Sequence, residues 1–179
     1  MMRKRSHEEL LKRQRTQSQD RLPFAVVLNN IRSLYNVGSI FRTADGVGIE
    51  KIWLCGITGI PPDPQISKTA LGAEKSLSWE FRENAVSLLR ELKQQGYQIV
   101  LLEQTVQSIP YQEFCPEGPI CLVIGNEISG VSEDLLPYCD RAIEIEMAGI
   151  KNSLNVTVAL GVVAYHIRNQ LITIDKGRS

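Results

Sequence analysis

Three short segments of the chain combine glycine with polar side chains. The first is NVGSIFRTADGVG at residues 36–48, the second is IGNEISGVS at 124–132, and the third is IEMAGIKNSLNV at 145–156. The second follows an apolar run of strand length, and the third begins at the end of another. Because ligands of open α/β sheets bind beyond the carboxyl ends of strands, these two segments predict a ligand site formed by two adjacent loops.

Residue types in the second and third segments favour close binding of a polar ligand. Gly125 and Gly130 let the backbone turn sharply and approach a ligand. Lys151, Asn152 and Ser153 place hydrogen-bond donors near the start of an expected final helix, where backbone N–H groups also attract anions. Taken alone, the Gly-Asn-Glu of the second segment is more often an ordinary turn. The pattern therefore predicts a site without identifying its ligand.

The first segment contains one residue that a purely structural helix does not need. We expect residues 38–45 to form a short helix, with Asn36 as its N-cap and with Gly46 and Gly48 at its end. That accounts for the asparagine and the glycines. It does not account for Arg42, which stands among small and apolar residues. A guanidinium in such a setting either extends to water or binds an anion.

Several other chemistries are disfavoured. The chain has no GxGxxG pattern, no Walker lysine loop and no Ser/His/Asp set, which disfavours nicotinamide-dependent, ATPase and hydrolase functions. The cysteine separations of 60, 6 and 18 fit no zinc-binding spacing, and we expect no metal site. We expect free thiols in a reducing compartment, with two disulfides as the alternative. The cysteines are Cys55, Cys115, Cys121 and Cys139.

Apolar runs and helix-like stretches alternate along the chain, and the runs are apolar on both faces. This pattern predicts an α/β fold in which a parallel sheet is flanked by helices on both sides. The last helix is apolar around nearly its whole circumference, which predicts that a partner subunit covers part of it. The expected strands are 24–28, 52–55, 79–81, 99–102, 120–124 and 142–145. The expected helices are 6–19, 38–45, 83–95, 132–138 and about 153–169, with a Gly- and Pro-rich loop at 58–65.

Composition and charge indicate a soluble protein with a basic arm. Of the 179 residues 43% are hydrophobic and 22% are charged, and no apolar run approaches the ~18 residues of a membrane span. We expect a cytoplasmic protein made of an arm, residues 1–21, and one domain, residues 22–179. The arm has a net charge of +4 and the domain −4. The arm therefore either contacts nucleic acid or serves as a solubilising helical tail.

Taken together and in order, the three segments resemble the three motifs of the SpoU (TrmH-like) branch of the SPOUT RNA methyltransferases. NVGSIFRTADGVG resembles the first motif, IGNEISGVS the second and IEMAGIKNSLNVTVA the third. The stretch TALGAEKSLSWE, residues 69–80, is similar to the segment before the middle strand of that branch. The resemblance covers residues 24–169. Its departures are small, with Ser39 where alanine is frequent and Thr157 where serine is frequent.

The resemblance implies a SPOUT-type sheet whose C-terminal part forms a deep trefoil knot, and it implies a homodimer. It also implies S-adenosyl-L-methionine as the methyl donor and a ribose 2'-hydroxyl of tRNA or rRNA as the acceptor. The residues expected to bind the donor are Gly125, Ile145, Leu154, Met147 and Thr105. Those expected near the reacting groups are Asn36, Arg42, Glu127, Ser153 and Asn155. Those expected to contact RNA are Arg42 and, in the arm, Arg3, Lys4, Arg5, Lys12, Arg13 and Arg15.

The residue types suit this chemistry. A sulfonium methyl is already activated, so the enzyme must align an in-line attack and remove a proton from a weakly acidic hydroxyl. Arg42 is a poor base because guanidinium rarely loses its proton, so we expect it to orient the ribose or its phosphate and to stabilise oxyanion charge. The general base stays open. Alternatives are a catalytically silent RNA-binding protein on the same fold and a base methyltransferase of the same superfamily.

Overall fold

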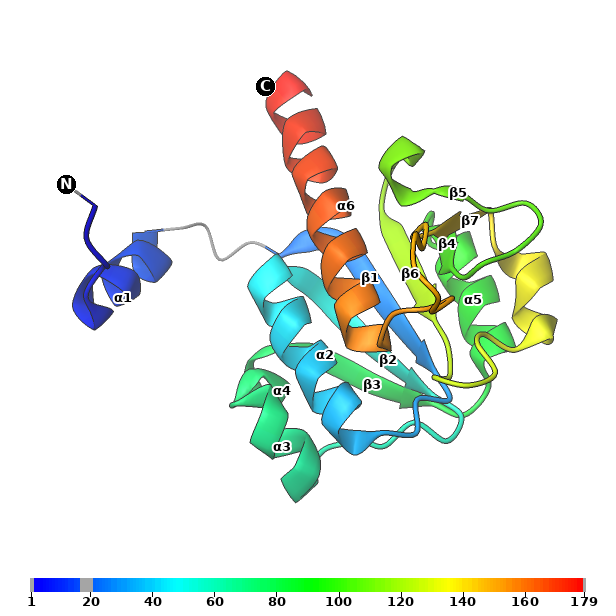
Figure 1. Cartoon of the computed structure of the whole chain (residues 1–179), viewed down its shortest axis with the longest axis horizontal. Coiled ribbons are helices and arrows are strands. Elements are labelled where there is room, and N and C mark those ends of the chain that lie inside the picture. Colours follow the sequence, from blue (N-terminus) through cyan, green and yellow to red (C-terminus); the bar gives the residue numbers. More distant parts are fainter. Residues whose placement is uncertain (1, 17–20, 179) are drawn as a thin grey trace.

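The computed structural model describes residues 2–16 and 21–178, and its body is a parallel sheet covered by helices (Figure 1). Seven strands lie in the order β3-β2-β1-β6-β4-β7-β5, and every neighbouring pair is parallel. The α/β fold with a helix-flanked parallel sheet is thereby confirmed. The strands are β1 (Leu22–Asn29), β2 (Ile49–Cys55), β3 (Ser78–Arg82), β4 (Gln98–Leu102), β5 (Ile109–Pro110), β6 (Ile120–Ile124) and β7 (Arg141–Glu144).

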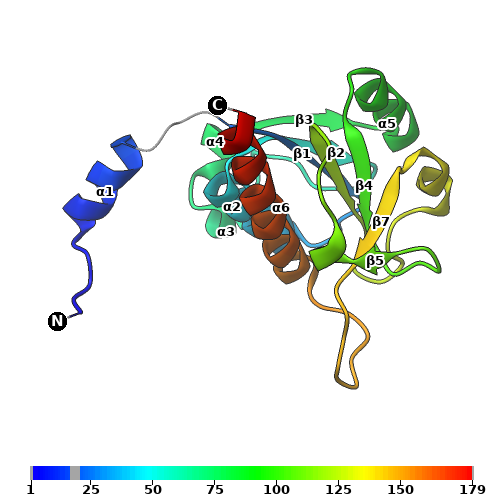
Figure 2. The same ribbon diagram turned by 90° about the horizontal axis from the view of Figure 1, so that it is seen from above.

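Helices cover both faces of the sheet (Figure 2). Because successive side chains along a strand point to opposite faces, each central strand contributes to two apolar cores. In β1, Phe24, Val26 and Leu28 join one apolar core, while Ala25 and Val27 join the other. Residues of α2, α3, α4 and α6 complete the first core, and residues of α5 and η2 complete the second. The helices are α1 (His7–Thr16), α2 (Leu34–Val47), α3 (Pro64–Ala70), α4 (Ala73–Ser76), α5 (Ala85–Gln94) and α6 (Val156–Arg178), with 3-10 turns η1 (Tyr111–Glu113) and η2 (Glu133–Tyr138).

Helix α2 begins earlier than the sequence predicts. Its N-cap is Ser33, whose side chain accepts a hydrogen bond from the backbone N–H of Asn36, so the predicted capping role of Asn36 is wrong. The helix also runs through Gly46 to Val47, and its C-cap is Gly48, which has a φ of 86°. As a result the Asn36 side chain is free for contacts outside the helix.

The Gly- and Pro-rich stretch after β2 leads directly into two helices that the sequence pattern did not predict. Helix α3 starts where the Asp63 carboxylate accepts hydrogen bonds from the N–H groups of Gln65 and Ile66, with Pro64 in the first turn. Helix α3 has only 7 residues, of which Ile66 and Ala70 are buried. Two buried positions are too few to show a helical period of apolar residues in the sequence.

The last helix differs from its prediction in both its start and its burial. Helix α6 begins at Val156, because the side chain of Asn155 accepts a hydrogen bond of 2.9 Å from the N–H of Thr157 and so caps the helix. Val158 is 50% exposed, and Tyr165 is 48% exposed. The helix is therefore not buried all round within one chain. It presents an apolar stripe to solvent.

The N-terminal arm is a short helix with a reciprocal cap. The Glu9 carboxylate accepts a hydrogen bond of 2.7 Å from the N–H of Ser6, and the Ser6 hydroxyl accepts one of 3.2 Å from the N–H of Glu9. Of the predicted helix 6–19, residues 17–19 lie outside the described residues. Arg21 pairs with Asp45 of α2 at 2.8 Å, so the folded body includes this last residue of the predicted arm.

The structure also bears on disulfides, metal sites and membrane spans. All four cysteines are free thiols. Within residues 2–16 and 21–178, no group of three His, Cys, Asp or Glu side chains is placed to hold a metal ion. None of the described helices is long and apolar enough to cross a membrane.

Candidate active site

A cavity of about 660 Å³ opens at the carboxyl edge of the sheet. It is formed by the segments that follow β4, β6 and β7 and by the first turn of α6. The two loops predicted from the sequence supply most of its wall, and the loop after β4 is a third contributor. The lining residues are Leu102, Glu103, Gln104, Ile124, Gly125, Asn126, Glu127, Ile128, Gly130, Glu144, Ile145, Met147, Asn152, Ser153, Leu154, Asn155, Val156 and Ala159.

Four of the five residues expected to bind the donor line this cavity. They are Gly125, Ile145, Met147 and Leu154. Thr105 is not among the lining residues, because its loop turns away after Gln104 in a tight turn closed by Ser108, whose hydroxyl donates to the Thr105 carbonyl at 2.7 Å. The cavity thus presents apolar side chains on the β7 and α6 side and backbone groups on the β6 side.

Gly125 lies where β6 ends and where the backbone leaves no room for a side chain. A Cβ at this position would lie 2.3 Å from backbone atoms of Gly130 and Val131. The turn is tight because Asn126 and Gly130 exchange two backbone hydrogen bonds of 2.9 and 3.0 Å. Gly130 itself has a φ of +69°, a conformation that favours glycine. Both glycines of the second motif are therefore required by the turn that forms the cavity wall.

Glu103 and Gln104 shape the cavity, although nothing in the sequence pattern singled them out. The Glu103 carboxylate accepts a hydrogen bond of 3.2 Å from the N–H of Val131, in the loop after β6. The Gln104 side chain donates one of 2.7 Å to the carbonyl of Asn152, in the loop after β7. The only available signal was their place directly after an apolar run, at the carboxyl end of an expected strand.

Three of the residues expected near the reacting groups form a hydrogen-bonded chain at the mouth of the cavity. The side-chain amide of Asn36 donates to Glu127 Oε1 at 2.8 Å, and the Asn155 amide donates to Asn36 Oδ1 at 3.4 Å. Glu127 and Asn155 line the cavity, and Asn36, which does not line it, is hydrogen-bonded to both. Ser153 also lines the cavity. The structure thus brings together one residue from each of the three motifs.

Glu127 is held as a carboxylate by the groups around it. Partial burial raises its pKa, but hydrogen bonds from the Asn36 side chain and from the backbone N–H groups of Glu127 itself, Arg32 and Ser33 outweigh this effect. The pKa of Glu127 is therefore lowered from its ordinary value. At neutral pH this residue accepts hydrogen bonds and carries a negative charge.

Arg42 lies apart from this cluster within the chain. It is six residues beyond Asn36 in α2, which corresponds to about 9 Å along the helix axis and to a different face of the helix. Its side chain is exposed, and it does not line the described cavity. For Arg42 to act on a hydroxyl at the donor, RNA or a second subunit has to bring the two together.

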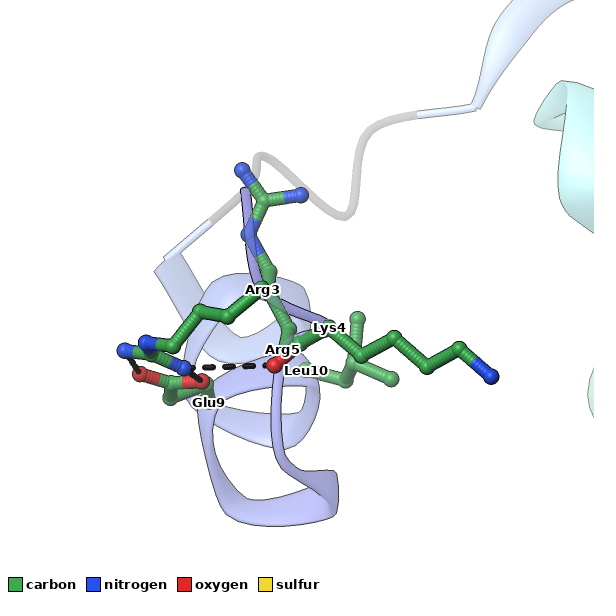
Figure 3. A pocket seen from close by; sticks show the side chains of 5 residues that line it. All are labelled: Arg3, Lys4, Arg5, Glu9 and Leu10. Atoms are coloured by element: carbon green, nitrogen blue, oxygen red, sulfur yellow. Dashed lines mark hydrogen bonds and ion pairs between the residues drawn. The ribbon is translucent and has the colours of Figure 1, made fainter. Parts of the chain in front are cut away.

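Of the arm residues expected to contact RNA, Arg3, Lys4 and Arg5 lie around a separate, open hollow of about 690 Å³ (Figure 3), whereas Lys12 and Arg13 do not line it. Arg3 forms a two-pronged pair with the Glu9 carboxylate, at 2.9 and 2.6 Å, while Lys4 and Arg5 point away from that pair. The side chain of Arg15 lies outside the described part of the chain. The hollow is lined only by arm residues. It therefore belongs to the arm and has no part in the cavity at the sheet edge.

The fold and the cavity define the class of protein. Parallel strands whose carboxyl ends frame a cavity of several hundred cubic ångströms are typical of α/β enzymes that bind a small organic ligand. Here the polar chain formed by Asn36, Glu127 and Asn155 stands at the mouth of that cavity, where a second substrate would approach.

The chain belongs to the SpoU rRNA Methylase family, whose model matches residues 23–165. This confirms the resemblance drawn from the three motifs. The chain is 34% identical over 167 residues to the tRNA (guanosine(18)-2'-O)-methyltransferase of Aquifex aeolicus, and the match covers 93% of this chain and 75% of the relative. It is 29% identical over 150 residues to a 23S rRNA (guanosine-2'-O-)-methyltransferase of Neisseria meningitidis, covering 84% and 60%. The chain thus spans about three fifths of some of its relatives.

Solved structures show the same fold. The A. aeolicus TrmH/SpoU tRNA modifying enzyme matches with a TM-score of 0.78 at 32% identity, over 95% of this chain and 85% of that one. The SpoU methyltransferase of Streptomyces viridochromogenes in complex with AdoMet also matches with a TM-score of 0.78, at 25% identity over 88% and 63%.

Proposed function

We propose that this chain is an S-adenosylmethionine-dependent methyltransferase that transfers a methyl group to a ribose 2'-hydroxyl of tRNA or rRNA. The observation that carries the proposal is the hydrogen-bonded chain of Asn36, Glu127 and Asn155, which joins the three motifs of a SpoU family member at the mouth of one cavity. The names of its relatives, which include both tRNA and rRNA ribose methyltransferases, supply the substrate class.

The cavity suits the proposed donor. S-adenosylmethionine has an adenosine part, which apolar side chains and backbone groups can hold, and a charged sulfonium and amino-acid part. Leu154, Met147 and Ile145 offer the apolar contacts, and the tight turn at Gly125 exposes backbone groups. Glu103 and Glu144 place negative charge at the cavity wall, which favours a cationic ligand. When bound, the donor supplies a methyl group that is already activated for transfer.

Each residue of the chain at the cavity mouth has a role in this proposal. Glu127 and Asn36 hold each other in place and fix the start of α2 against the loop after β6. Asn155 caps α6 and so positions Ser153 and Leu154 at the cavity. Arg42 orients the acceptor ribose or its phosphate and stabilises negative charge on the attacking oxygen. None of these residues is assigned as the base.

The proposal also includes a homodimer, a C-terminal trefoil knot and RNA binding by the arm. It places the protein in the cytoplasm. The apolar stripe on α6 supports a dimer, because Val158, Val162 and Tyr165 follow the spacing of one helix face and are all exposed. The exposed position of Arg42 outside the cavity supports it as well. The arm carries Lys4 and Arg5 free of the Arg3–Glu9 pair, where they can meet phosphate.

The experiment that tests this function uses purified full-length protein, S-adenosylmethionine with a labelled methyl group and total RNA. We expect label to enter RNA, and we expect S-adenosylhomocysteine to bind and to compete with the donor. Donor binding without transfer to any RNA fraction would support a catalytically silent RNA-binding protein and would contradict the proposal. The matched control is Arg90→Ala, an exposed residue of α5, which should transfer label at the wild-type rate.

A further inference from the structure

An exposed aromatic ring stands directly beside the candidate active site. Tyr35 lies in the first turn of α2 and is 46% exposed. The next residue is Asn36, which donates to Glu127 at the cavity mouth. A large ring in this position has no part in either core and no role in the chemistry proposed above. It is adjacent in the chain to Asn36, whose bond to Glu127 fixes the start of α2 beside the cavity.

A lysine accompanies this ring. Lys68 of α3 places its ammonium group 5.9 Å from the centre of the Tyr35 ring, close enough for a cation–π contact. Arg32, three residues before Tyr35, is also exposed. The body as a whole carries a net charge of −4, so positive charge beside the site is a local feature and not an average property of this surface.

The backbone beneath Tyr35 and Lys68 is tightly held. Thr69, adjacent to Lys68, donates a hydrogen bond of 3.0 Å from its hydroxyl to the Tyr35 carbonyl. Helix α2 also approaches α3 so closely at Gly38 that a Cβ there would lie 2.2 Å from the Ile66 carbonyl oxygen. The spacing between the ring and the lysine is therefore set by two packed helices and not by a flexible loop.

A second tyrosine with a cation over its ring shows what a structural pair looks like in this chain. Arg90 lies 4.9 Å from the ring centre of Tyr138, and its guanidinium donates to the Tyr138 hydroxyl. Tyr138 packs against the second apolar core. Tyr35 belongs to neither core and is nearly half exposed. The pair of Arg90 and Tyr138 thus serves packing, whereas the pair of Lys68 and Tyr35 leaves the tyrosine ring open to solvent.

We propose that Tyr35 and Lys68 form a nucleobase subsite, in which an unpaired base next to the methylated nucleotide stacks on the Tyr35 ring while Lys68 contacts its phosphate. The proposal rests on the function proposed above. Proteins recognise unpaired RNA by stacking bases on aromatic side chains and by placing cations along the backbone. The subsite would make the enzyme select an acceptor whose neighbouring base is free to leave its stack.

The test compares Tyr35→Leu, Tyr35→Phe and Lys68→Ala with the wild type in binding bulk tRNA across a salt series. Loss of one stacked base weakens binding by roughly 5- to 150-fold, so Tyr35→Leu should lose affinity in this range while Tyr35→Phe keeps it. Tyr35→Leu should leave the salt dependence unchanged. Lys68→Ala should reduce its slope by about 0.7, the value for one phosphate of a single strand. Arg90→Ala is the matched control for removal of a cation from a tyrosine ring, and it should change neither quantity.

Two further measurements separate the possible failures. Binding of S-adenosylhomocysteine and the fraction of dimer should be the same in Tyr35→Leu as in the wild type, and binding to a fully paired RNA duplex should also be unchanged. Wild-type affinity for bulk tRNA in Tyr35→Leu, or an equal loss for the duplex, would overturn the subsite. Loss of the dimer would overturn it too, because Tyr35 would then belong to a subunit interface. Failure of the wild type to methylate RNA would instead overturn the proposed function.

Discussion

The side-chain amide of Asn36 donates a hydrogen bond of 2.8 Å to the carboxylate of Glu127, across 91 residues of sequence. The contact links the first turn of α2 to the loop that follows β6. Because Glu127 also accepts from the backbone N–H groups of Arg32 and Ser33, one carboxylate fixes the whole entry to α2 beside the cavity. Any displacement of this carboxylate moves two of the three motifs relative to each other.

Asn36→Ala should slow methyl transfer while leaving donor binding nearly intact. The substitution removes the bond that fixes the start of α2 against Glu127, and a displacement of about 1 Å at the site can cost on the order of 100-fold in rate. Asn36 does not line the donor cavity, so the affinity for S-adenosylhomocysteine should change little. Single-turnover methylation and calorimetry measure the two effects. Asn84→Ala, which removes the cap of α5 far from the site, controls for a general loss of stability. Equal losses in both variants would contradict the role of Asn36.

Glu127→Gln should change the pH dependence of stability in a defined direction. The pKa of Glu127 is lowered in the folded protein, so its ionised form contributes stability above the ordinary carboxyl pKa of about 4.3. That contribution is lost as the pH falls through the lowered value. The free energy of unfolding of the wild type should therefore exceed that of Glu127→Gln at pH 7, and the difference should shrink below about pH 4. Denaturant unfolding at several pH values measures this. A difference that grows as the pH falls would contradict the assignment.

Arg42→Ala should abolish methyl transfer without harming the fold or donor binding. Its side chain is exposed and lies outside the cavity, so its removal leaves no buried gap and no lost donor contact. Surface substitutions of this kind usually alter stability by less than about 0.5 kcal/mol. Single-turnover methylation beside a donor titration tests the role. Near-normal turnover would exclude Arg42 from catalysis, and a large loss of donor affinity would place it in the donor site.

Leu154→Arg should weaken donor binding far more than RNA binding. Leu154 lines the cavity beside the first turn of α6, and it is 39% exposed, so a longer side chain can be accommodated without unfolding. The guanidinium would bring positive charge to a site proposed to hold a sulfonium cation. Calorimetry with S-adenosylhomocysteine, which is uncharged at sulfur, and with S-adenosylmethionine should show the larger loss for the latter. Unchanged affinity for both in a folded variant would mean that Leu154 does not contact the donor.

Deletion of residues 1–16 should flatten the salt dependence of RNA binding. Arg21 is retained because it pairs with Asp45 of the body. If two or three basic residues of the arm meet phosphate, the slope of log affinity against log salt should fall by about 2. Donor affinity should not change, because the cavity is formed entirely by downstream residues. RNA binding by full-length and truncated protein across a salt series provides the comparison. An unchanged slope would identify the arm as a solubilising tail.

Six of the seven strands were predictable from their apolar runs, whereas the two-residue strand β5 is too short to carry such a signal. Runs such as Phe24 to Leu28 and Ile120 to Ile124 are apolar without alternation, which is what a strand covered on both faces requires. Gly125, Ile145 and Leu154, which the resemblance groups as donor-binding residues, all line one cavity. Both kinds of inference depend on the pattern of residues within a short stretch of sequence.

The remaining features depend on contacts that no local pattern contains. Helix α2 starts at Ser33 because a serine cap acts there, although Asn36 is an equally good capping residue by type. Glu103 and Gln104 reach the cavity through hydrogen bonds to loops 28 and 48 residues away. Thr105 does not line the cavity, because the turn closed by Ser108 directs the chain away from it. Arg42 belongs to the first motif but lies outside the cavity. Its position could not be predicted, because spacing in the sequence does not show which face of a helix a neighbouring element covers.

The identity of the methylated atom tests the central claim most directly. RNA methylated in vitro by the purified protein with a labelled donor should be digested to nucleosides and analysed by mass spectrometry. We predict that the label is found in a 2'-O-methylated nucleoside, and that Asn36→Ala and Arg42→Ala greatly reduce this product. Label on a base, with no 2'-O-methylated nucleoside formed, would contradict the account.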